Sequence, residues 1–227
     1  MANLTCTRYL VLPLSRPAQR ILAWKLRPLL IDGSKFKTNS DMKRLDTSLQ
    51  GVFLIEPTVF SDERGFFYES YHKAKFAEIG IRGEFVQDNH SKSAKRTLRG
   101  LHYQLGHPQA KLCRVVYGDV LDAVVDIRKG SPTFGRSLTT VLSADNKKMI
   151  YIPPGFAHGF LVLSETAEFL YKCDDFYYPA EERGIAWSDP ELGIEWGIDD
   201  PIISGKDKLH PRLSAVASEH LPVYRPA

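Results

Sequence analysis

Cationic and titratable side chains are concentrated between Thr97 and Arg114, in the stretch TLRGLHYQLGHPQAKLCR. Two arginines, two histidines and a lysine are interleaved with Leu and Tyr, which are found in strands, so the charged groups are set on a β scaffold. His102 lies in the middle of the predicted strand, and imidazole is the side chain that changes charge near neutral pH. A lone strand histidine is most simply a buried group bonded to a backbone carbonyl. The cations around His102 favour a second interpretation, in which it is a general base.

A second histidine motif lies in residues 152–158, where IPPGFAH has the spacing P-x-G-x-x-H. This spacing resembles the second motif of the cupin jelly-roll superfamily. Metal-binding cupins carry an H-x-H pair and a glutamate in an earlier motif, but residues 102–104 read HYQ here, and the next histidine is His107. Positions five apart on a strand point to opposite faces, so His102 and His107 are not expected to share a metal ion. We therefore predict an acid–base site without a metal or a cofactor.

Short strands must position these groups. The runs GVFLIEP (51–57) and RGFFYES (64–70) are followed by SYHKAKFAEIG (70–80), a predicted short helix with Ser70 as its N-cap and Gly80 as its end. Seven more strand-like runs continue to Lys172, separated by turn formers at a spacing of roughly 8 to 12 residues. The pattern predicts an all-β fold, a cupin-type double-stranded β-helix or jelly-roll barrel, with short flanking helices.

One strand has a polar face that suits the wall of a pocket. In EFVQDNHS (84–91), Gln87, Asn89 and Ser91 share one face, whereas Val86 and Asp88 share the other. After Lys172 the strand pattern gives way to a Pro-, Asp- and Gly-rich segment with many aromatic residues. We expect this segment to wrap the barrel and to cap its mouth, because so many aromatic side chains are unfavourable in water.

The net charge of +3 is unevenly distributed along the chain. Residues 1–41 hold seven of the 30 basic residues and two of the 27 acidic ones, which leaves 23 basic and 25 acidic residues in the remainder. The basic character therefore belongs to the N-terminal segment and is no argument for nucleic-acid binding by the main domain.

Cysteine content and hydropathy argue against disulfide-stabilised, zinc-binding and membrane-spanning classes of protein. The three cysteines lack CxxC spacing, which argues against a disulfide framework and a zinc site and indicates a reducing cytoplasm. The sequence contains no run of 18 apolar residues, so no membrane span is predicted.

Three segments describe the domain organisation. Residues 1–41 have no clear period and are interpreted as an organelle leader, an ordered extension, or a disordered or non-native segment upstream of a start at Met42. Residues 42–212 are predicted to form one catalytic domain, and residues 213–227 a C-terminal tail.

A family resemblance rests on nine strings that occur in order. They are SDERGFFYES, FVQDNHSKS, LRGLHYQ, QAKLCRV, VVDIRKGSPTFG, IPPGFAHGFLVLSE, AEFLYK, YYPAEE and SGKD. Together they resemble the dTDP-4-dehydrorhamnose 3,5-epimerase family, and the stretch that begins at Met42 is similar to the usual start of its members. The resemblance implies a metal-independent homodimer that inverts C3 and C5 of a nucleotide-linked 4-keto-6-deoxy sugar on the way to dTDP-L-rhamnose.

The resemblance also implies roles for single residues. Epimerisation beside a ketone requires a base on one face of the sugar, an acid on the other, and a charge that stabilises the enolate. By resemblance, His102 is the base, Asp207 its carboxylate partner, Tyr171 the acid and Lys111 the cation. Arg64 and Arg99 match pyrophosphate contacts, and Tyr177 matches an aromatic that stacks on thymine. The other implied substrate contacts are Glu69, Gln87, Asp88, Asn89, His158, Glu182 and Lys206.

Strand 64–69 suggests how two subunits associate. Arg64, Phe66 and Tyr68 lie on one face and Phe67 and Glu69 on the other, so both faces require partners. We predict a two-fold dimer in which this N-terminal strand joins the partner's sheet.

Other functions remain open at the level of sequence. An enzyme of the same fold could epimerise a single carbon or isomerise the keto sugar. A metal-dependent cupin oxygenase and a non-catalytic nucleotide-sugar-binding cupin are less favoured, because the acid and the base are both present.

Overall fold

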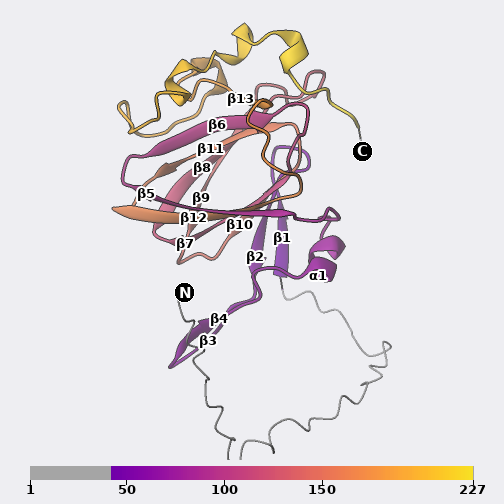
Figure 1. Cartoon of the computed structure of the whole chain (residues 1–227). Helices are drawn as coiled ribbons and strands as arrows, with labels where there is room; N and C mark the ends of the chain where they lie inside the picture. The colour runs from indigo at the N-terminus through magenta and orange to yellow at the C-terminus, as the bar shows by residue number, and fades with distance from the viewer. Residues whose placement is uncertain (1–41, 227) are drawn as a thin grey trace, which may run out of the picture. The chain divides into compact units, whose positions relative to one another are not determined.

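A computed structural model describes residues 42–226, and the interpretations of residues 1–41 lie outside this range. Two antiparallel sheets form the body of the molecule (Figure 1). The first has the order β1 (Met42–Asp46), β2 (Phe53–Pro57), β10 (Met149–Ile152), β7 (Lys111–Tyr117), β12 (Thr166–Cys173) and β5 (Gln87–Ala94). The second has the order β13 (Glu182–Gly184), β6 (Leu98–Gln104), β11 (Phe156–Val162), β8 (Asp119–Asp126) and β9 (Ser137–Ser143).

The two sheets enclose the main hydrophobic core. Its buried members come from both sheets and include Val115 of β7, Val124 of β8, Phe160 of β11 and Phe169 of β12. The rings of Phe160 and Phe169 stack across the sheets at a centroid distance of 4.3 Å. Antiparallel strands with alternating inward side chains, folded as two facing sheets, make the jelly-roll barrel that the sequence predicts.

Helix α1 (Lys73–Glu78) covers the edge of the first sheet and buries Phe76. The prediction that Ser70 is its N-cap is wrong. His72 is the N-cap, and its ring nitrogen Nδ1 accepts a hydrogen bond of 3.4 Å from the Lys75 amide. Tyr71 lies in the connection that precedes the helix, and its ring packs against Phe76.

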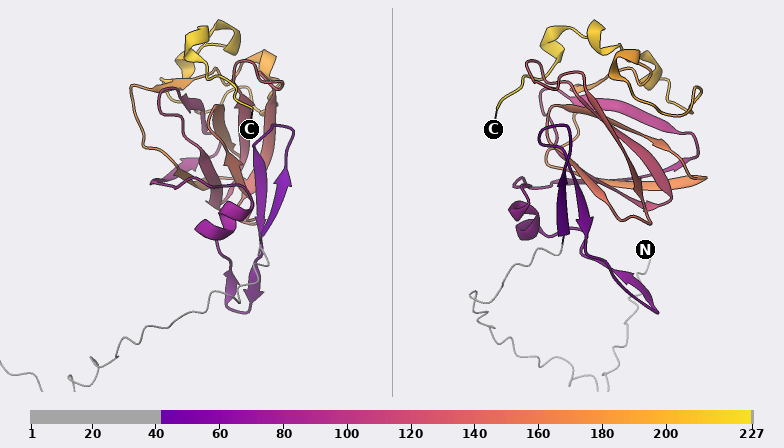
Figure 2. Two further views of the ribbon diagram at one scale, coloured as in Figure 1. Left: turned by 90° about the vertical axis from the view of Figure 1, so that its right-hand side faces the viewer. Right: turned by 180° about the vertical axis from the view of Figure 1, so that it is seen from behind.

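The hairpin of β3 (Phe60–Asp62) and β4 (Gly65–Phe67) pairs only with itself among the described strands. Figures 1 and 2 show it extending away from both sheets. Phe60, Phe66 and Phe67 are exposed, and Phe67 reaches 72%. A strand pair with this much apolar surface in water is typical of an association site.

The chain after β13 covers the outer face of the second sheet (Figure 1, yellow). Trp196, Leu213 and Leu221 pack with Leu101 of β6 and Val125 of β8 in a second core cluster. Four short 3-10 helices lie in this segment: η2 (Pro190–Leu192), η3 (Asp207–Leu209), η4 (Leu213–Ala215) and η5 (Ser218–His220). The wrapping that the sequence predicts is therefore found, and residues beyond 212 take part in it.

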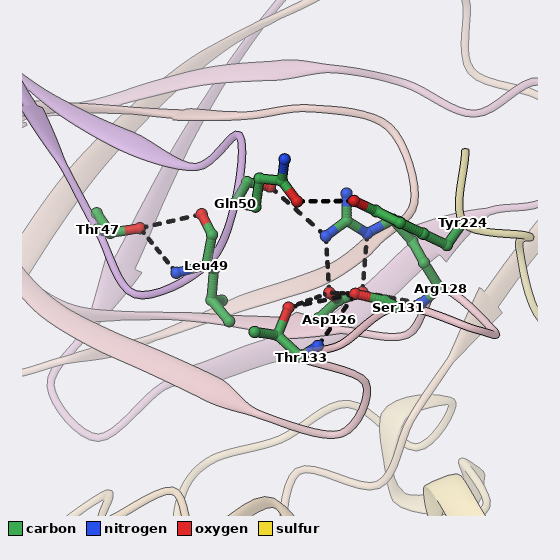
Figure 3. Close-up of polar contacts among 8 residues, drawn as sticks. All are labelled: Thr47, Leu49, Gln50, Asp126, Arg128, Ser131, Thr133 and Tyr224. Atoms are coloured by element: carbon green, nitrogen blue, oxygen red, sulfur yellow. Dashed lines mark hydrogen bonds and ion pairs between the residues drawn. The ribbon is translucent and has the colours of Figure 1, made fainter. Parts of the chain in front are cut away.

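A buried carboxylate ties this C-terminal segment to the barrel (Figure 3). Asp126, at the end of β8, is fully buried and accepts hydrogen bonds from Arg128, Ser131 and Thr133. The Arg128 guanidinium lies 4.1 Å from the centre of the Phe156 ring and 5.0 Å from that of Tyr224. Burial alone would raise the pKa of Asp126, but its hydrogen bonds to Arg128, Ser131 and Thr133 lower it below its usual value.

The Asp126→Asn variant is expected to lose about 3 kcal/mol of unfolding free energy, because it leaves the largely buried Arg128 guanidinium without its counter-charge. Urea unfolding at neutral pH measures the loss, and Asp145→Asn is the control, since Asp145 is exposed. The lowered pKa gives the pH dependence: the stabilisation is present above the unfolded-state pKa of about 3.9 and is lost as the pH falls below it. An equal response in both variants would contradict this assignment.

Candidate active site

A cavity of about 660 Å³ opens between the two sheets. It is lined by side chains of β5, β6, β7, β11 and β12 and by the loops after β12. Eleven of the fourteen residues predicted for the site line it: Gln87, Asn89, Arg99, His102, Lys111, His158, Tyr171, Tyr177, Glu182, Lys206 and Asp207. The three residues of the polar face predicted for strand 84–91, Gln87, Asn89 and Ser91, all line the cavity.

His102 and Asp207 form a hydrogen-bonded pair on the wall made by the second sheet. Nε2 of His102 lies 2.9 Å from Oδ1 of Asp207, and Oδ2 of the carboxylate accepts a longer bond of 3.4 Å from the Gly100 amide. Burial alone would raise the pKa of Asp207, but the hydrogen bond from His102 and the proximity of His210 hold it well below its usual range. The carboxylate therefore stays charged, fixes Nε2 as the protonated nitrogen and leaves the Nδ1 lone pair as the basic one.

Tyr171 comes from β12 of the first sheet, whereas His102 comes from β6 of the second. The two side chains therefore enter the cavity from facing sheets. Burial raises the pKa of Tyr171 to about 12, and the charge of Arg99 only partly opposes this effect. A phenol with this pKa is fully protonated at neutral pH, so it can donate a proton opposite the imidazole.

Two cations flank the pair. Lys111 begins β7, and Arg99 lies on β6, where its Nε donates a 3.0 Å bond to Ser93. Arg99 and His102 are three residues apart and would face opposite ways on a regular strand. A register irregularity between β6 and β11 brings both to the cavity, at the point where Gly100 has φ +125° and an added Cβ would lie 2.6 Å from Gly159.

His158 is held by a carboxylate that sequence reasoning missed. Its Nε2 lies 2.9 Å from Oδ2 of Asp122, a fully buried residue of β8. The two residues are 36 positions apart, and only the pairing of β11 with β8 brings them together. The Asp122 carboxylate fixes the tautomer and direction of the imidazole at the cavity wall.

An aromatic side chain lies at the cavity mouth. The Tyr177 amide donates a 2.9 Å bond to Gln87, and its hydroxyl donates to Glu182, which also pairs with Lys206. Burial alone would raise the pKa of Glu182, but the bonds from Lys206 and Tyr177 lower it. Gln104, which was not predicted, holds the same loop by accepting from the Tyr178 amide at 2.7 Å.

Three predicted contacts do not line this cavity. Asp88 points from the other face of β5 and pairs with Lys172 at 2.8 Å, as the alternation of the strand requires. Arg64 lies on the hairpin, where it is 85% exposed and pairs with Asp62. Glu69 follows the hairpin and pairs with Lys75 at 2.9 Å.

His210 is a further residue that sequence reasoning missed. It lies three positions after Asp207, and its Nε2 approaches Oδ1 of that carboxylate to 3.6 Å. Within residues 42–226, His102, Asp207 and His210 are the one group of histidine, cysteine and acidic side chains whose ligand atoms could share a metal ion. His107, the partner considered from the sequence, instead stacks on Tyr178 at a centroid distance of 3.9 Å.

The facing antiparallel sheets, with an acid–base pocket between them, define a protein of the cupin type. A sequence profile described as dTDP-4-dehydrorhamnose 3,5-epimerase matches residues 46–215. This chain belongs to the dTDP-4-dehydrorhamnose 3,5-epimerase family.

Individual relatives agree with this assignment. The chain is 55% identical over 168 residues to a dTDP-4-dehydrorhamnose 3,5-epimerase of Shigella flexneri, a match that spans 73% of this chain and 93% of the relative. The structure of this chain is similar to that of the RmlC epimerase of Legionella pneumophila in complex with dTDP-4-keto-L-rhamnose, with a TM-score of 0.79 and 46% sequence identity. The match covers 82% of this chain and 100% of the other. The structure is also similar to that of ChmJ, a 3'-monoepimerase of Streptomyces bikiniensis, with a TM-score of 0.74 and 35% identity over 79% and 93% of the two chains.

None of the helices within residues 42–226 combines the length and the apolar character needed to cross a bilayer.

Proposed function

We propose that this chain is an isomerase that converts dTDP-4-dehydro-6-deoxy-D-glucose to dTDP-4-dehydro-L-rhamnose by inverting C3 and C5. The observation that carries the proposal is the pairing of a carboxylate-bound imidazole with a protonated phenol from the facing sheet, in one cavity that also holds two cations. Family membership supports the sugar nucleotide as substrate.

The first step is removal of the proton on the carbon next to the C4 ketone. Nδ1 of His102 accepts this proton, and Asp207 stabilises the imidazolium that forms, because its carboxylate already bonds Nε2 at 2.9 Å. The electron pair of the C–H bond moves into the enolate, whose charge develops on the C4 oxygen. Lys111 stabilises that oxygen, and a fixed cation in a pocket of this kind is worth several kcal/mol.

Inversion requires that the new proton arrives on the opposite face. The Tyr171 hydroxyl supplies it and becomes a phenolate. The imidazolium then releases its proton to solvent and the phenolate takes one up, which restores the pair before the second inversion. The Tyr171 pKa of about 12 keeps the hydroxyl loaded with a proton at neutral pH. The same geometry serves C5 and then C3, because both carbons neighbour the C4 ketone.

The nucleotide part binds at the mouth. Tyr177 offers a half-exposed ring on which thymine stacks, a contact worth about 1 to 3 kcal/mol. Arg99 is the pyrophosphate contact within this chain's own cavity, because a guanidinium pairs two phosphate oxygens at once.

Solvent exchange tests the proposal. The protein is incubated with dTDP-4-keto-6-deoxy-D-glucose in deuterated water, and NMR follows C3 and C5. Deuterium and inverted configuration at both carbons are expected. Exchange at one carbon alone would favour a monoepimerase, the activity of ChmJ, over the proposed double inversion. No exchange at either carbon would reject both.

We further propose a two-fold dimer in which the β3–β4 hairpin enters the partner's cavity region. Three observations support it: the hairpin pairs with no other described strand, its phenylalanines are exposed, and Arg64 does not line its own chain's cavity. Exchange of this strand would bury the phenylalanines and bring Arg64 to the partner's pyrophosphate.

Complementation between two defective variants is expected. Arg64→Ala and His102→Ala proteins are each nearly inactive, and their mixture after subunit exchange regains activity. In a mixed dimer, one site receives an intact His102 from one chain and an intact Arg64 from the other. Random mixing makes about half of the dimers mixed, each with one complete site, so about a quarter of wild-type activity is expected.

The control mixes His102→Ala with Asp207→Asn protein, whose lesions lie in the same wall of one chain's cavity. Neither lesion lies on the exchanged hairpin, so each cavity of a mixed dimer keeps the lesion of its own chain. No recovery is expected in this control. A monomer by light scattering, or no recovery with the Arg64→Ala mixture despite subunit exchange, would reject strand exchange.

A further inference from the structure

We propose that His102, Asp207 and His210 form a Zn²⁺ site whose occupation blocks the base of the proposed reaction. The part of the proposal that concerns inhibition rests on the proposed function, whereas the part that concerns binding does not. The site joins the imidazole of His102 in β6 to the carboxylate of Asp207 in η3 and to the imidazole of His210, the residue that follows η3, so it exists only in the folded chain.

The three ligand atoms are close to the arrangement that zinc requires. Oδ1 of Asp207 lies 2.9 Å from Nε2 of His102 and 3.6 Å from Nε2 of His210, and all three atoms lie within 4.8 Å of one another. Ligands bound to tetrahedral Zn²⁺ at about 2.0 to 2.1 Å are separated by about 3.3 Å. Small rotations of the imidazoles therefore suffice to place all three on one ion.

His210 is the ligand that distinguishes this site from a simple base–carboxylate pair. Its side chain is 10% exposed, and its Nε2 is buried and makes no hydrogen bond, because Oδ1 of Asp207 lies 3.6 Å away. The ring is confined against Gly184, where an added Cβ would lie 2.2 Å from Nε2. A buried imidazole nitrogen without a partner costs free energy, and a metal ion that accepts its lone pair removes that cost.

Zinc on Nε2 changes the tautomer of His102. In the metal-free site Nε2 carries the proton, which it donates to Asp207, and Nδ1 holds the lone pair that accepts a proton from the sugar. When Nε2 binds the ion, the neutral ring must carry its proton on Nδ1. The imidazole then has no lone pair for the substrate, so the bound ion is an inhibitor.

Direct binding tests the site without reference to activity. Chelator-treated full-length protein is titrated with Zn²⁺ alone, in competition with a chromophoric chelator. We expect one ion per chain. The His210→Gln variant should bind Zn²⁺ at least about 10-fold to 100-fold more weakly, because loss of a residue that only supports a ligand already weakens metal binding by this factor. The control is His90→Gln, because His90 also lies 3.0 Å from a carboxylate, that of Glu168, but on the barrel surface. This control should bind like the wild type.

Two further measurements keep the proposal falsifiable if His210→Gln does not fold. Anomalous diffraction from crystals soaked in Zn²⁺ should place the ion within about 2.1 Å of the three ligand atoms. Exchange of solvent deuterium into the sugar should also fall in proportion to added Zn²⁺ and stop at one equivalent per chain, and a chelator should restore it. Equal affinity in wild type and His210→Gln, affinity lost in His90→Gln, or an ion placed elsewhere would each overturn the site. Inactivity of the metal-free protein would reject the proposed function and leave the binding result standing.

Discussion

His102→Ala is expected to lower turnover on the sugar nucleotide by about 10² to 10⁴, the usual contribution of a general base. The imidazole is partly exposed in the cavity and is not part of either core cluster, so the variant should fold like the wild type. Deuterium exchange at C3 and C5 should fall with turnover, because proton removal is the step lost. Steady-state kinetics and NMR exchange measure both quantities on the same sample.

His220→Ala is the control for loss of an imidazole, because His220 is exposed in the C-terminal segment. It should retain wild-type turnover. Asp207→Asn should also impair the reaction, since an amide cannot stabilise the imidazolium that forms. Near-normal turnover in His102→Ala would show that another group removes the proton and that the assignment of the base is wrong.

Local patterns were sufficient to predict the fold. Alternation along β5 identified Gln87, Asn89 and Ser91 as a pocket wall, because a strand presents every second side chain to the same face. The predicted helix start was wrong because the His72 imidazole caps the first turn, and histidine is not among the residues preferred at that position.

Most residues that a family motif names line the cavity, whereas contacts that tertiary pairing creates could not be predicted from the sequence. Asp122 meets His158 only because β8 pairs with β11. His210 had a local signal, since it lies three residues after Asp207 in a short turn, but no pattern indicated that this turn brings it beside His102. For Asp88 the local pattern was the better guide. Alternation along β5 places it on the face away from the cavity, where it pairs with Lys172, although the family resemblance implied a substrate contact.

Tyr171→Phe is expected to separate proton removal from inversion. The change deletes one hydroxyl and keeps the ring that packs beside Phe169, so the fold and nucleotide affinity should be nearly preserved. His102 can still remove a proton, and Lys111 can still stabilise the enolate. The enolate then lacks its donor on the opposite face and is reprotonated mainly by the imidazolium that formed it. Inverted product should fall by about 10²-fold or more, while deuterium still enters the sugar with retained configuration.

Tyr151→Phe is the matched control. Burial also raises the pKa of Tyr151 to about 12, and its ring also packs in the first sheet, against Phe53, but it does not line the cavity. A general effect of losing a buried hydroxyl would appear in both variants, whereas loss of the acid appears in Tyr171→Phe alone. Because exchange and inversion are read from one NMR sample, a defect in binding lowers both and a missing acid lowers only inversion. Wild-type inversion by Tyr171→Phe would show that water or another side chain delivers the proton, and the two-sided mechanism would then be wrong.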